Sequence, residues 1–187
     1  MSRWQPDARG RLEQAALELF GERGFEAVTV AEIAERAGLT ERTFFRHYAD
    51  KREVLFGGGG KALEELLTGS VAAAPADAAP LEVVGAALAA AGAALEERRE
   101  LARRRSRIIA ANPELQEREL IKLASWADSL RSALLARGVA DPTARLAAEV
   151  GIACFRVAFE RWIAPKNRRP LAELIGASLG EVASLTT

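Results

Sequence analysis

Two arginines and a threonine share one face of a short predicted helix. At 100° per residue, Arg42, Thr43 and Arg46 fall on the same side of this helix. The aromatic residues Phe44 and Tyr48 fall on the opposite side, which is therefore the buried one. A guanidinium group can grip O6 and N7 of guanine, and threonine can hydrogen-bond a base or a phosphate while its methyl group contacts thymine. The outward face thus has the chemistry of a DNA major-groove reader.

Positive charge is concentrated near this helix although the chain as a whole is neutral. The 187 residues contain 26 Lys and Arg and 26 Asp and Glu, so net charge gives no sign of a polyanion-binding protein. Lys51 and Arg52 follow the helix and can bind phosphates, as can the backbone amides of the preceding helix, which starts at Thr29. Nucleic-acid affinity is expected from this local cluster.

Capping signals place three helices in the first fifty residues. Apolar residues at spacings of three and four predict a first helix over residues 9–23, which Gly24 ends. Thr29 and Glu32 form a capping box for a second helix, which Gly38 ends. Thr40 can cap the third helix, which is the outward-facing one. The three helices predict a compact helix-turn-helix domain.

The same geometry also occurs as an ordinary corner of all-α proteins, so the spacing leaves both interpretations open. Residues 8–56 resemble the TetR family of bacterial transcriptional repressors. The pieces that carry the resemblance are Gly24-Phe25, the run from Thr29 to Gly38, and Thr43 to Tyr48 followed by Lys51.

The resemblance assigns phosphate or base contacts to seven residues. Phe45 stands where the family often has a tyrosine that reaches phosphate, so its contact can only be apolar. Arg46 joins the set by its outward position. The expected DNA-binding residues are Thr29, Thr40, Arg42, Thr43, Phe45, Arg46, His47 and Lys51.

Beyond residue 52 the chain predicts further helices and no strand. A fourth helix opens at Asp50, but it runs into Gly57–Gly60, which is either a plain linker or a functional hinge. Further helices are expected over residues 81–95, 96–111, 113–137, 142–163 and 171–185. Asn112 and Asp141, each followed by proline, are expected N-caps. The fold class is all-α with about nine helices, with a helix-turn-helix domain at 1–52 and a helical domain at 53–187.

The resemblance implies that the second domain binds a small ligand and dimerises through the last two helices. Both helices carry compatible stripes, although these could instead bury against their own core. The expected interface residues are Ala147, Gly151, Cys154, Ala158, Trp162, Leu171, Leu174, Ile175, Ser178, Leu179 and Val182. A pocket for a hydrophobic ligand is expected at Leu66, Leu88, Trp126, Leu130, Phe155 and Phe159, although each is also a candidate for the core.

Other classes of function find little support. The sequence has no nucleophile elbow, phosphate loop or metal-spaced cluster, and its single histidine leaves little for acid–base chemistry, so neither an enzyme nor a cofactor is expected. No apolar run reaches the ~20 residues of a membrane span. The N-terminus lacks a secretory signal and Cys154 is alone, so a cytoplasmic protein is expected. A homodimer that binds double-stranded operator DNA and a small molecule is favoured over a helical binding or scaffold protein without DNA binding.

Overall fold

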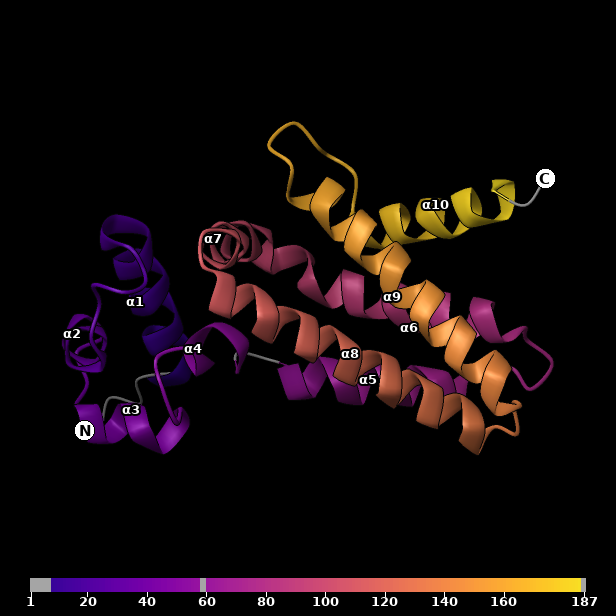
Figure 1. Cartoon of the computed structure of the whole chain (residues 1–187), viewed down its shortest axis with the longest axis horizontal. Helices are drawn as coiled ribbons and strands as arrows, with labels where there is room; N and C mark the ends of the chain where they lie inside the picture. Colours follow the sequence, from indigo (N-terminus) through magenta and orange to yellow (C-terminus); the bar gives the residue numbers. More distant parts are fainter. Residues whose placement is uncertain (1–7, 58–59, 186–187) are drawn as a thin grey trace, which may run out of the picture. The chain divides into compact units, whose positions relative to one another are not determined.

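Every regular element in the part of the chain that the structure describes is helical. The computed structural model describes residues 8–57 and 60–185. The α-helices, labelled in Figure 1, are α1 (Ala8–Arg23), α2 (Val30–Arg36), α3 (Glu41–His47), α4 (Glu53–Phe56), α5 (Gly60–Ala73), α6 (Pro80–Leu95), α7 (Arg99–Ala110), α8 (Pro113–Ala136), α9 (Asp141–Ile163) and α10 (Leu171–Ser184). A 3₁₀ helix, η1 (Glu96–Arg98), lies between α6 and α7. The predicted all-α class is confirmed.

The expected fourth helix is split at the glycine run. α4 ends at Phe56, and Gly57 caps it by donating its N–H to the Glu53 carbonyl at 2.7 Å. A Cβ at Gly57 would lie 3.0 Å from Arg9 Nη2, from Tyr48 Cε1 and from the Glu53 carbonyl oxygen, so an alanine there would be tightly packed and its neighbours would have to shift by a few tenths of an ångström. α5 begins at Gly60, where a Cβ would meet nothing within 4 Å. Gly58 and Gly59, the middle of the expected linker or hinge, lie outside the described residues.

The chain forms two compact units. One contains the residues up to Gly60 together with Leu101–Glu119, and the other contains Lys61–Glu100 together with the residues from Leu120 onward. The units therefore do not coincide with the expected segments 1–52 and 53–187, because α4 and residues 101–119 pack with the first three helices. A functional boundary near residue 52 stays a prediction.

The core of the first unit joins residues that are far apart in the sequence. Leu12 of α1, Ile33 of α2 and Phe44 of α3 are fully buried in one cluster. Ile108 and Leu115 enter the same cluster from the 101–119 segment. Each large apolar side chain that is fully buried contributes roughly 1.5–3 kcal/mol. The 101–119 segment is thus part of the hydrophobic core that supports α3.

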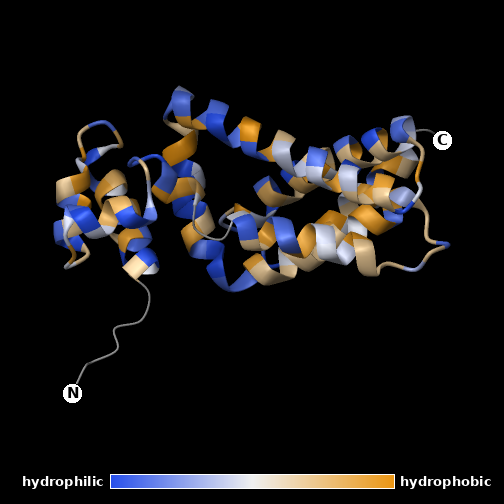
Figure 2. Ribbon diagram, turned by 90° about the horizontal axis from the view of Figure 1, so that it is seen from below, coloured by the Kyte–Doolittle hydropathy of each residue, from blue (hydrophilic) through white to orange (hydrophobic). Residues whose placement is uncertain are grey.

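In the second unit, glycines let α6, α9 and α10 approach closely. A Cβ at Gly85 of α6 would meet Leu179 of α10, and a Cβ at Gly151 of α9 would meet Val84 and Leu88 of α6. At Gly92 of α6 a Cβ would come within 3.1–3.2 Å of α10 atoms. Hydrophobic and hydrophilic residues alternate along the helices of the chain in Figure 2. The small residues serve close packing within one chain.

Polar side chains fasten the remaining helices of this unit. Arg137 at the end of α8 donates to the carbonyls of Val71, Ala74 and Pro75, which ties down the C-terminal end of α5. The Glu96 carboxylate accepts hydrogen bonds from Trp162 Nε1 at 3.1 Å and from the backbone N–H of Leu171 at 3.1 Å. The first turn of α10 is thereby held to the end of α9.

One predicted cap is wrong. Ala140, not Asp141, occupies the N-cap of α9, and it makes no side-chain cap bond. The Asp141 carboxylate instead pairs with Arg131 of α8 at 2.6 Å, and the hydrogen bond from Arg131 lowers the pKa of Asp141. The Asp141 carboxylate therefore binds a side chain of the preceding helix instead of a backbone N–H at the start of its own helix.

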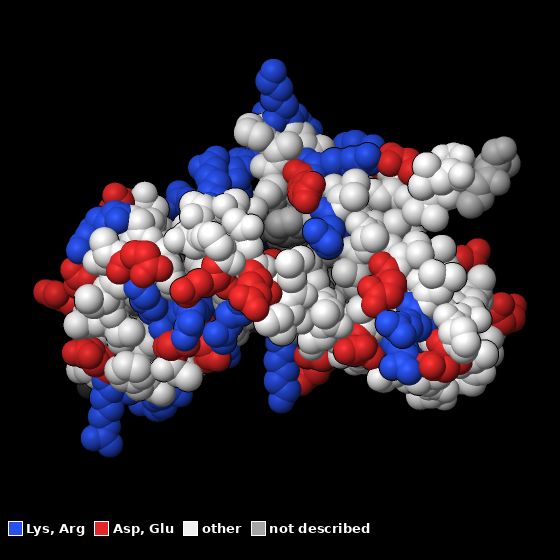
Figure 3. Space-filling view, viewed as in Figure 1, with Lys and Arg blue, Asp and Glu red and all other residues white. Residues whose placement is uncertain are grey.

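Charges of both signs are interspersed on the surface. On the face shown in Figure 3, Lys and Arg side chains alternate with Asp and Glu over both units, in keeping with the zero net charge. Among the described helices, none combines the length and the apolar composition that crossing a lipid bilayer requires.

Candidate nucleic-acid interface

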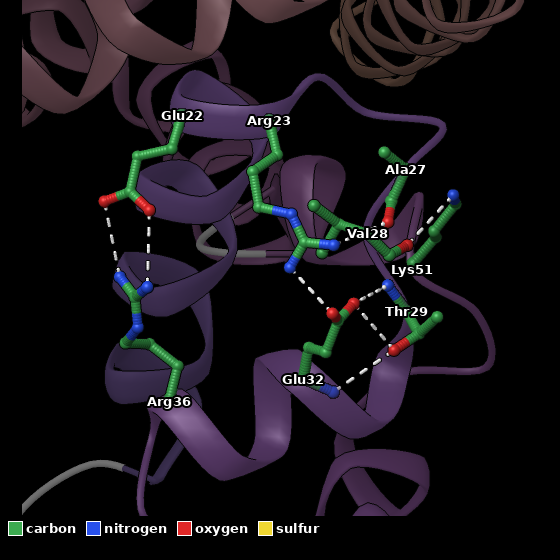
Figure 4. A network of polar contacts seen from close by, with 8 residues as sticks. All are labelled: Glu22, Arg23, Ala27, Val28, Thr29, Glu32, Arg36 and Lys51. Atoms are coloured by element: carbon green, nitrogen blue, oxygen red, sulfur yellow. Dashed lines mark hydrogen bonds and ion pairs between the residues drawn. The ribbon is translucent and has the colours of Figure 1, made fainter.

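The N-terminus of α2 is built as the capping box predicts. Thr29 Oγ1 accepts from the Glu32 backbone N–H at 3.3 Å, and Glu32 Oε2 accepts from the Thr29 backbone N–H at 2.8 Å (Figure 4). Arg23 of α1 pairs with the same carboxylate at 2.7 Å. The bond from the Thr29 N–H, followed by that from Arg23, lowers the pKa of Glu32 to about 2. The start of α2 is thus fixed locally and also to α1.

The turn into α3 also follows the sequence prediction. Gly38 ends α2 with a φ of +64°, in the left-handed region that glycine favours, and Leu39 donates its N–H to the Ala34 carbonyl at 2.8 Å. Thr40 then caps α3, because its hydroxyl oxygen accepts from the Thr43 backbone N–H at 3.2 Å. The predicted helix–turn–helix is confirmed in these residues.

α3 turns its two arginines away from the core. Phe44 is fully buried and Tyr48 is 1% exposed, which confirms the predicted buried side. Arg42 and Arg46 lie on the exposed side. Within the described residues, neither guanidinium group has a hydrogen-bond or ion-pair partner. Each therefore keeps its full set of donors for a ligand.

Phe45 lies beside them and is an exposed aromatic ring. It is 54% exposed and packs edge-on against Phe44, with the ring centroids 5.5 Å apart. The buried neighbour therefore orients a ring that remains open to contact. With no polar atom in its side chain, Phe45 can offer only an apolar surface.

The expected threonine contacts carry local bonds already. Thr29 Oγ1 donates to Glu32 Oε2 at 2.9 Å, and the hydroxyls of Thr40 and Thr43 lie 3.1 Å apart. His47 is half-buried, and its Nε2 is buried without a hydrogen-bond partner in the described residues. The threonines thus shape the helix ends, and the buried Nε2 of the histidine points away from a solvent-exposed ligand.

Lys51, an expected phosphate contact, is engaged elsewhere. Its Nζ donates to the carbonyls of Phe25, Glu26 and Val28 at 2.9, 3.2 and 3.2 Å. Its charge also lies 4.4 Å from the centroid of the Phe25 ring. A phosphate could reach this amino group only after one of these bonds breaks.

Sequence reasoning missed a pair of arginines that holds α4 within the first unit. Arg105 of α7 donates to the Leu55 carbonyl and pairs with Glu119, and its guanidinium lies 4.9 Å from the centroid of the Phe56 ring. Arg118 of α8 lies 5.6 Å from the same centroid and bonds Glu53 at 3.0 Å. Because the partners are 50 and 65 residues apart, no local pattern signals the contact.

The candidate pocket residues are only partly brought together. Trp126 and Phe155 have ring centroids 5.7 Å apart, and Phe159 follows at 5.9 Å from Phe155. Leu88 and Leu130 are fully buried. The outlier is Leu66, which is 36% exposed on α5. The aromatic residues form a continuous row, whereas a role in ligand binding stays a prediction.

Most of the candidate interface residues pack inside their own chain. Nine of them are buried, namely Ala147, Gly151, Cys154, Ala158, Trp162, Leu171, Leu174, Ile175 and Ser178, while Leu179 and Val182 are half-buried. Burial also raises the pKa of the Cys154 thiol, which favours inert packing. The expected stripes therefore face α6 and each other within one chain, whereas a role in dimerisation stays a prediction.

Comparisons with known proteins agree with this architecture. Residues 13–56 match the family described as bacterial regulatory proteins of the tetR family, and residues 78–186 match the MftR C-terminal domain. Over 176 residues the chain is 28% identical to MftR of Mycobacterium tuberculosis, a protein named for regulating mycofactocin biosynthesis; the match covers 92% of this chain and 88% of MftR.

Two solved structures share the fold. SmeT is a repressor from Stenotrophomonas maltophilia. Its complex with triclosan superposes with a TM-score of 0.67 at 19% identity, over 95% of this chain and 90% of SmeT. The complex of Thermus thermophilus FadR with lauroyl-CoA superposes with a TM-score of 0.57 at 24% identity, over 94% and 93%. With its N-terminal and C-terminal parts both matched, the chain belongs to the TetR family and is a transcriptional regulator.

Proposed function

We propose that this regulator is a homodimeric repressor that binds a palindromic operator in the cytoplasm and is released by a hydrophobic small molecule. The exposed pair Arg42 and Arg46 on α3, without partners among the described residues, is the observation that carries the DNA-binding part. In an otherwise neutral protein, two such arginines on a helix that fits the major groove have guanine bases or phosphates as their natural partners.

The length of α3 supports the proposal of a dimer. The helix has 7 residues and so spans about 10 Å at 1.5 Å per residue, which is about three base pairs. So short a site cannot specify one operator. Two copies of α3, placed one DNA turn apart by a two-fold axis, would read a palindrome of useful length.

An exposed apolar face is available for the second copy. Leu146, Ala153 and Val157 recur along the outer side of α9, and Leu146 is 66% exposed. On α10, a Cβ at Gly176 or Gly180 would meet nothing within 4 Å. Exposed apolar residues on α9 and glycines without close neighbours on α10 both suit the close approach of an identical helix pair. We assign the dimer interface to this face.

The aromatic row supports a hydrophobic ligand. Trp126, Phe155 and Phe159 gather large apolar surface between α8 and α9, and the two structural neighbours were solved with triclosan and lauroyl-CoA. The signal would reach DNA along the chain itself, because residues 101–119 connect two segments of the ligand-binding unit and also hold α4. Moving Arg105 and Arg118 would release Phe56 and the helix that follows α3.

Fluorescence anisotropy with a pool of random DNA tests the DNA-binding part. Binding should weaken as salt rises, because each phosphate contact adds about 0.9 to the slope of log K against log salt. The changes Arg42→Ala and Arg46→Ala should each weaken binding to the selected operator by about 1–3 kcal/mol if the arginine grips a guanine. Lys61→Ala is the control, since Lys61 is exposed on α5 and pairs with Glu65 in the same helix. If all three variants bind as well as the unsubstituted chain, Arg42 and Arg46 are not DNA contacts. If the unsubstituted chain shows no salt-dependent binding to the pool, the helical scaffold without DNA binding becomes the better interpretation.

Light scattering tests the dimer face. Gly180→Arg should yield a folded monomer, because the new side chain has open space within its own chain but would block the second copy. Gly69→Arg is the matched control on the exposed side of α5. A Gly180→Arg protein that remains a dimer would exclude this face.

A further inference from the structure

Lys51 connects the two ends of the helix–turn–helix. It follows α3 in the chain, whereas its three carbonyl partners lie in the loop that joins α1 to α2. The last of these carbonyls belongs to Val28, the residue before the N-cap Thr29, and Figure 4 shows this bond beside the capping box. Lys51 therefore ties the segment that follows α3 to the start of α2.

The chemistry of these contacts leaves no donor for DNA. An ammonium group has three N–H donors and no acceptor. The carbonyls of Phe25, Glu26 and Val28 supply one acceptor for each donor, and the Phe25 ring covers the charge. The adjacent cation, Arg52, is also engaged, since it pairs with Asp50 at 3.0 Å. The positive charge that meets DNA therefore comes from Arg42 and Arg46 of α3, and not from the two cations that follow this helix.

We propose that Lys51 is a positioning residue and not a phosphate ligand. It sets the distance between the start of α2 and the side chains of α3, which reach the bases. This inference rests on the proposed DNA-binding function. Loss of Lys51 should weaken operator binding because α2 and α3 lose their fixed spacing, while the number of phosphates neutralised stays the same.

Salt dependence separates positioning from phosphate binding. We would measure operator affinity over a range of salt for the full chain and for Lys51→Met, Lys51→Arg and Arg46→Met. If Lys51 bound a phosphate in each copy of a dimer, its removal would reduce the slope of log K against log salt by about 1.8. For Lys51→Met we expect an affinity lowered by about tenfold or more with the slope unchanged, because a helix–turn–helix that is no longer held in its binding geometry must be ordered when it binds. Arg46→Met is the matched comparison for the loss of an exposed charge on the DNA-facing helix.

Lys51→Arg keeps the inference testable if Lys51→Met unfolds. Arginine keeps the charge and grips phosphate well, but its planar fork cannot place three N–H groups on three carbonyls that converge on one atom. Positioning predicts weakened binding at an unchanged slope for this variant. If Lys51→Arg binds with wild-type affinity, or if the slope falls by about 1.8 in Lys51→Met, Lys51 is not a positioning residue. The proposed DNA-binding function would still stand in either case. If the unsubstituted chain shows no salt-dependent DNA binding, the proposed function falls and the role of Lys51 falls with it.

Discussion

Replacing Gly151 by alanine tests which way the small-residue side of α9 faces. The new methyl group would overlap Val84 Cγ1 and come within 3.1 Å of Leu88 Cδ1. Both neighbours are fully buried in α6 and have little room to move. Overpacking of this kind costs about 1–3 kcal/mol of the free energy of unfolding.

Gly69 provides the matched control for this change. It lies on the exposed side of α5, where a Cβ would meet nothing within 4 Å. Alanine there should stabilise the helix by about 0.5–1 kcal/mol, because it removes the conformational freedom of glycine from the unfolded chain. Gly151 is also inside a helix and gains the same term, so the two Gly→Ala changes should differ by the overpacking cost alone. That cost is about 1–3 kcal/mol, or roughly 2–12 °C in Tm for a chain of this size.

Urea unfolding at several protein concentrations is the appropriate assay. A shift of the urea midpoint at unchanged m-value reports a change in stability alone. Because the collision with Val84 lies within one chain, the penalty of Gly151→Ala should be independent of protein concentration. The reasoning is refuted if Gly151→Ala is as stable as Gly69→Ala but prevents the proposed dimer from forming, since the small-residue side of α9 would then face a partner.

Three further predictions concern the first unit, which contains α1 to α4 and residues 101–119. Replacing thymidine by deoxyuridine at the operator position that Phe45 contacts should weaken binding of the wild type but not of Phe45→Ala, because the Phe45 ring supplies the apolar contact to the thymine methyl group there. Equal losses in both proteins would mean that another group contacts that methyl group. The folded-state pKa of Glu32, about 2, lies below the ordinary value of 4.5, so Glu32 stabilises the fold above pH 4.5 and loses this effect as the pH falls toward 2. Thermal unfolding of the wild type and of Glu32→Gln should accordingly converge over that interval, and a constant difference would contradict the assignment. Gly57→Ala should alter operator affinity through its collision with Arg9 and Tyr48, whereas Gly60→Ala should not; identical affinities in an anisotropy titration would exclude a role for the tight contact at Gly57.

The parts of the fold that the sequence predicted are those with nearby partners. Thr29 and Glu32 bond each other across three residues, so the capping box can be read from spacing alone. Gly38 requires a left-handed backbone that few other residues adopt, and it ended α2 as predicted. The orientation of α3 followed in the same way from two aromatic residues on one side of a single short helix.

The contacts that escaped prediction depend on distant residues. Asp141 has a suitable cap sequence, but Arg131 on the preceding helix competes for its carboxylate. α9 carries small or apolar residues on two sides, and only the positions of α6 and α10 decide which side is buried. Lys51 stands in no local pattern that reveals three carbonyls more than twenty residues earlier.

The 101–119 segment determines how this protein can be divided. An excised fragment that ends at residue 60 would lack Ile108, Ile109 and Leu115 and would expose the apolar surface that these residues cover. Chimaeras that exchange ligand-binding units between regulators face the same constraint. The exchange should transfer residues 61–100 and 120–187, and it should leave residues 101–119 with the first unit. A single junction at the glycine run is therefore not enough, because one more junction is needed at each end of the 101–119 segment.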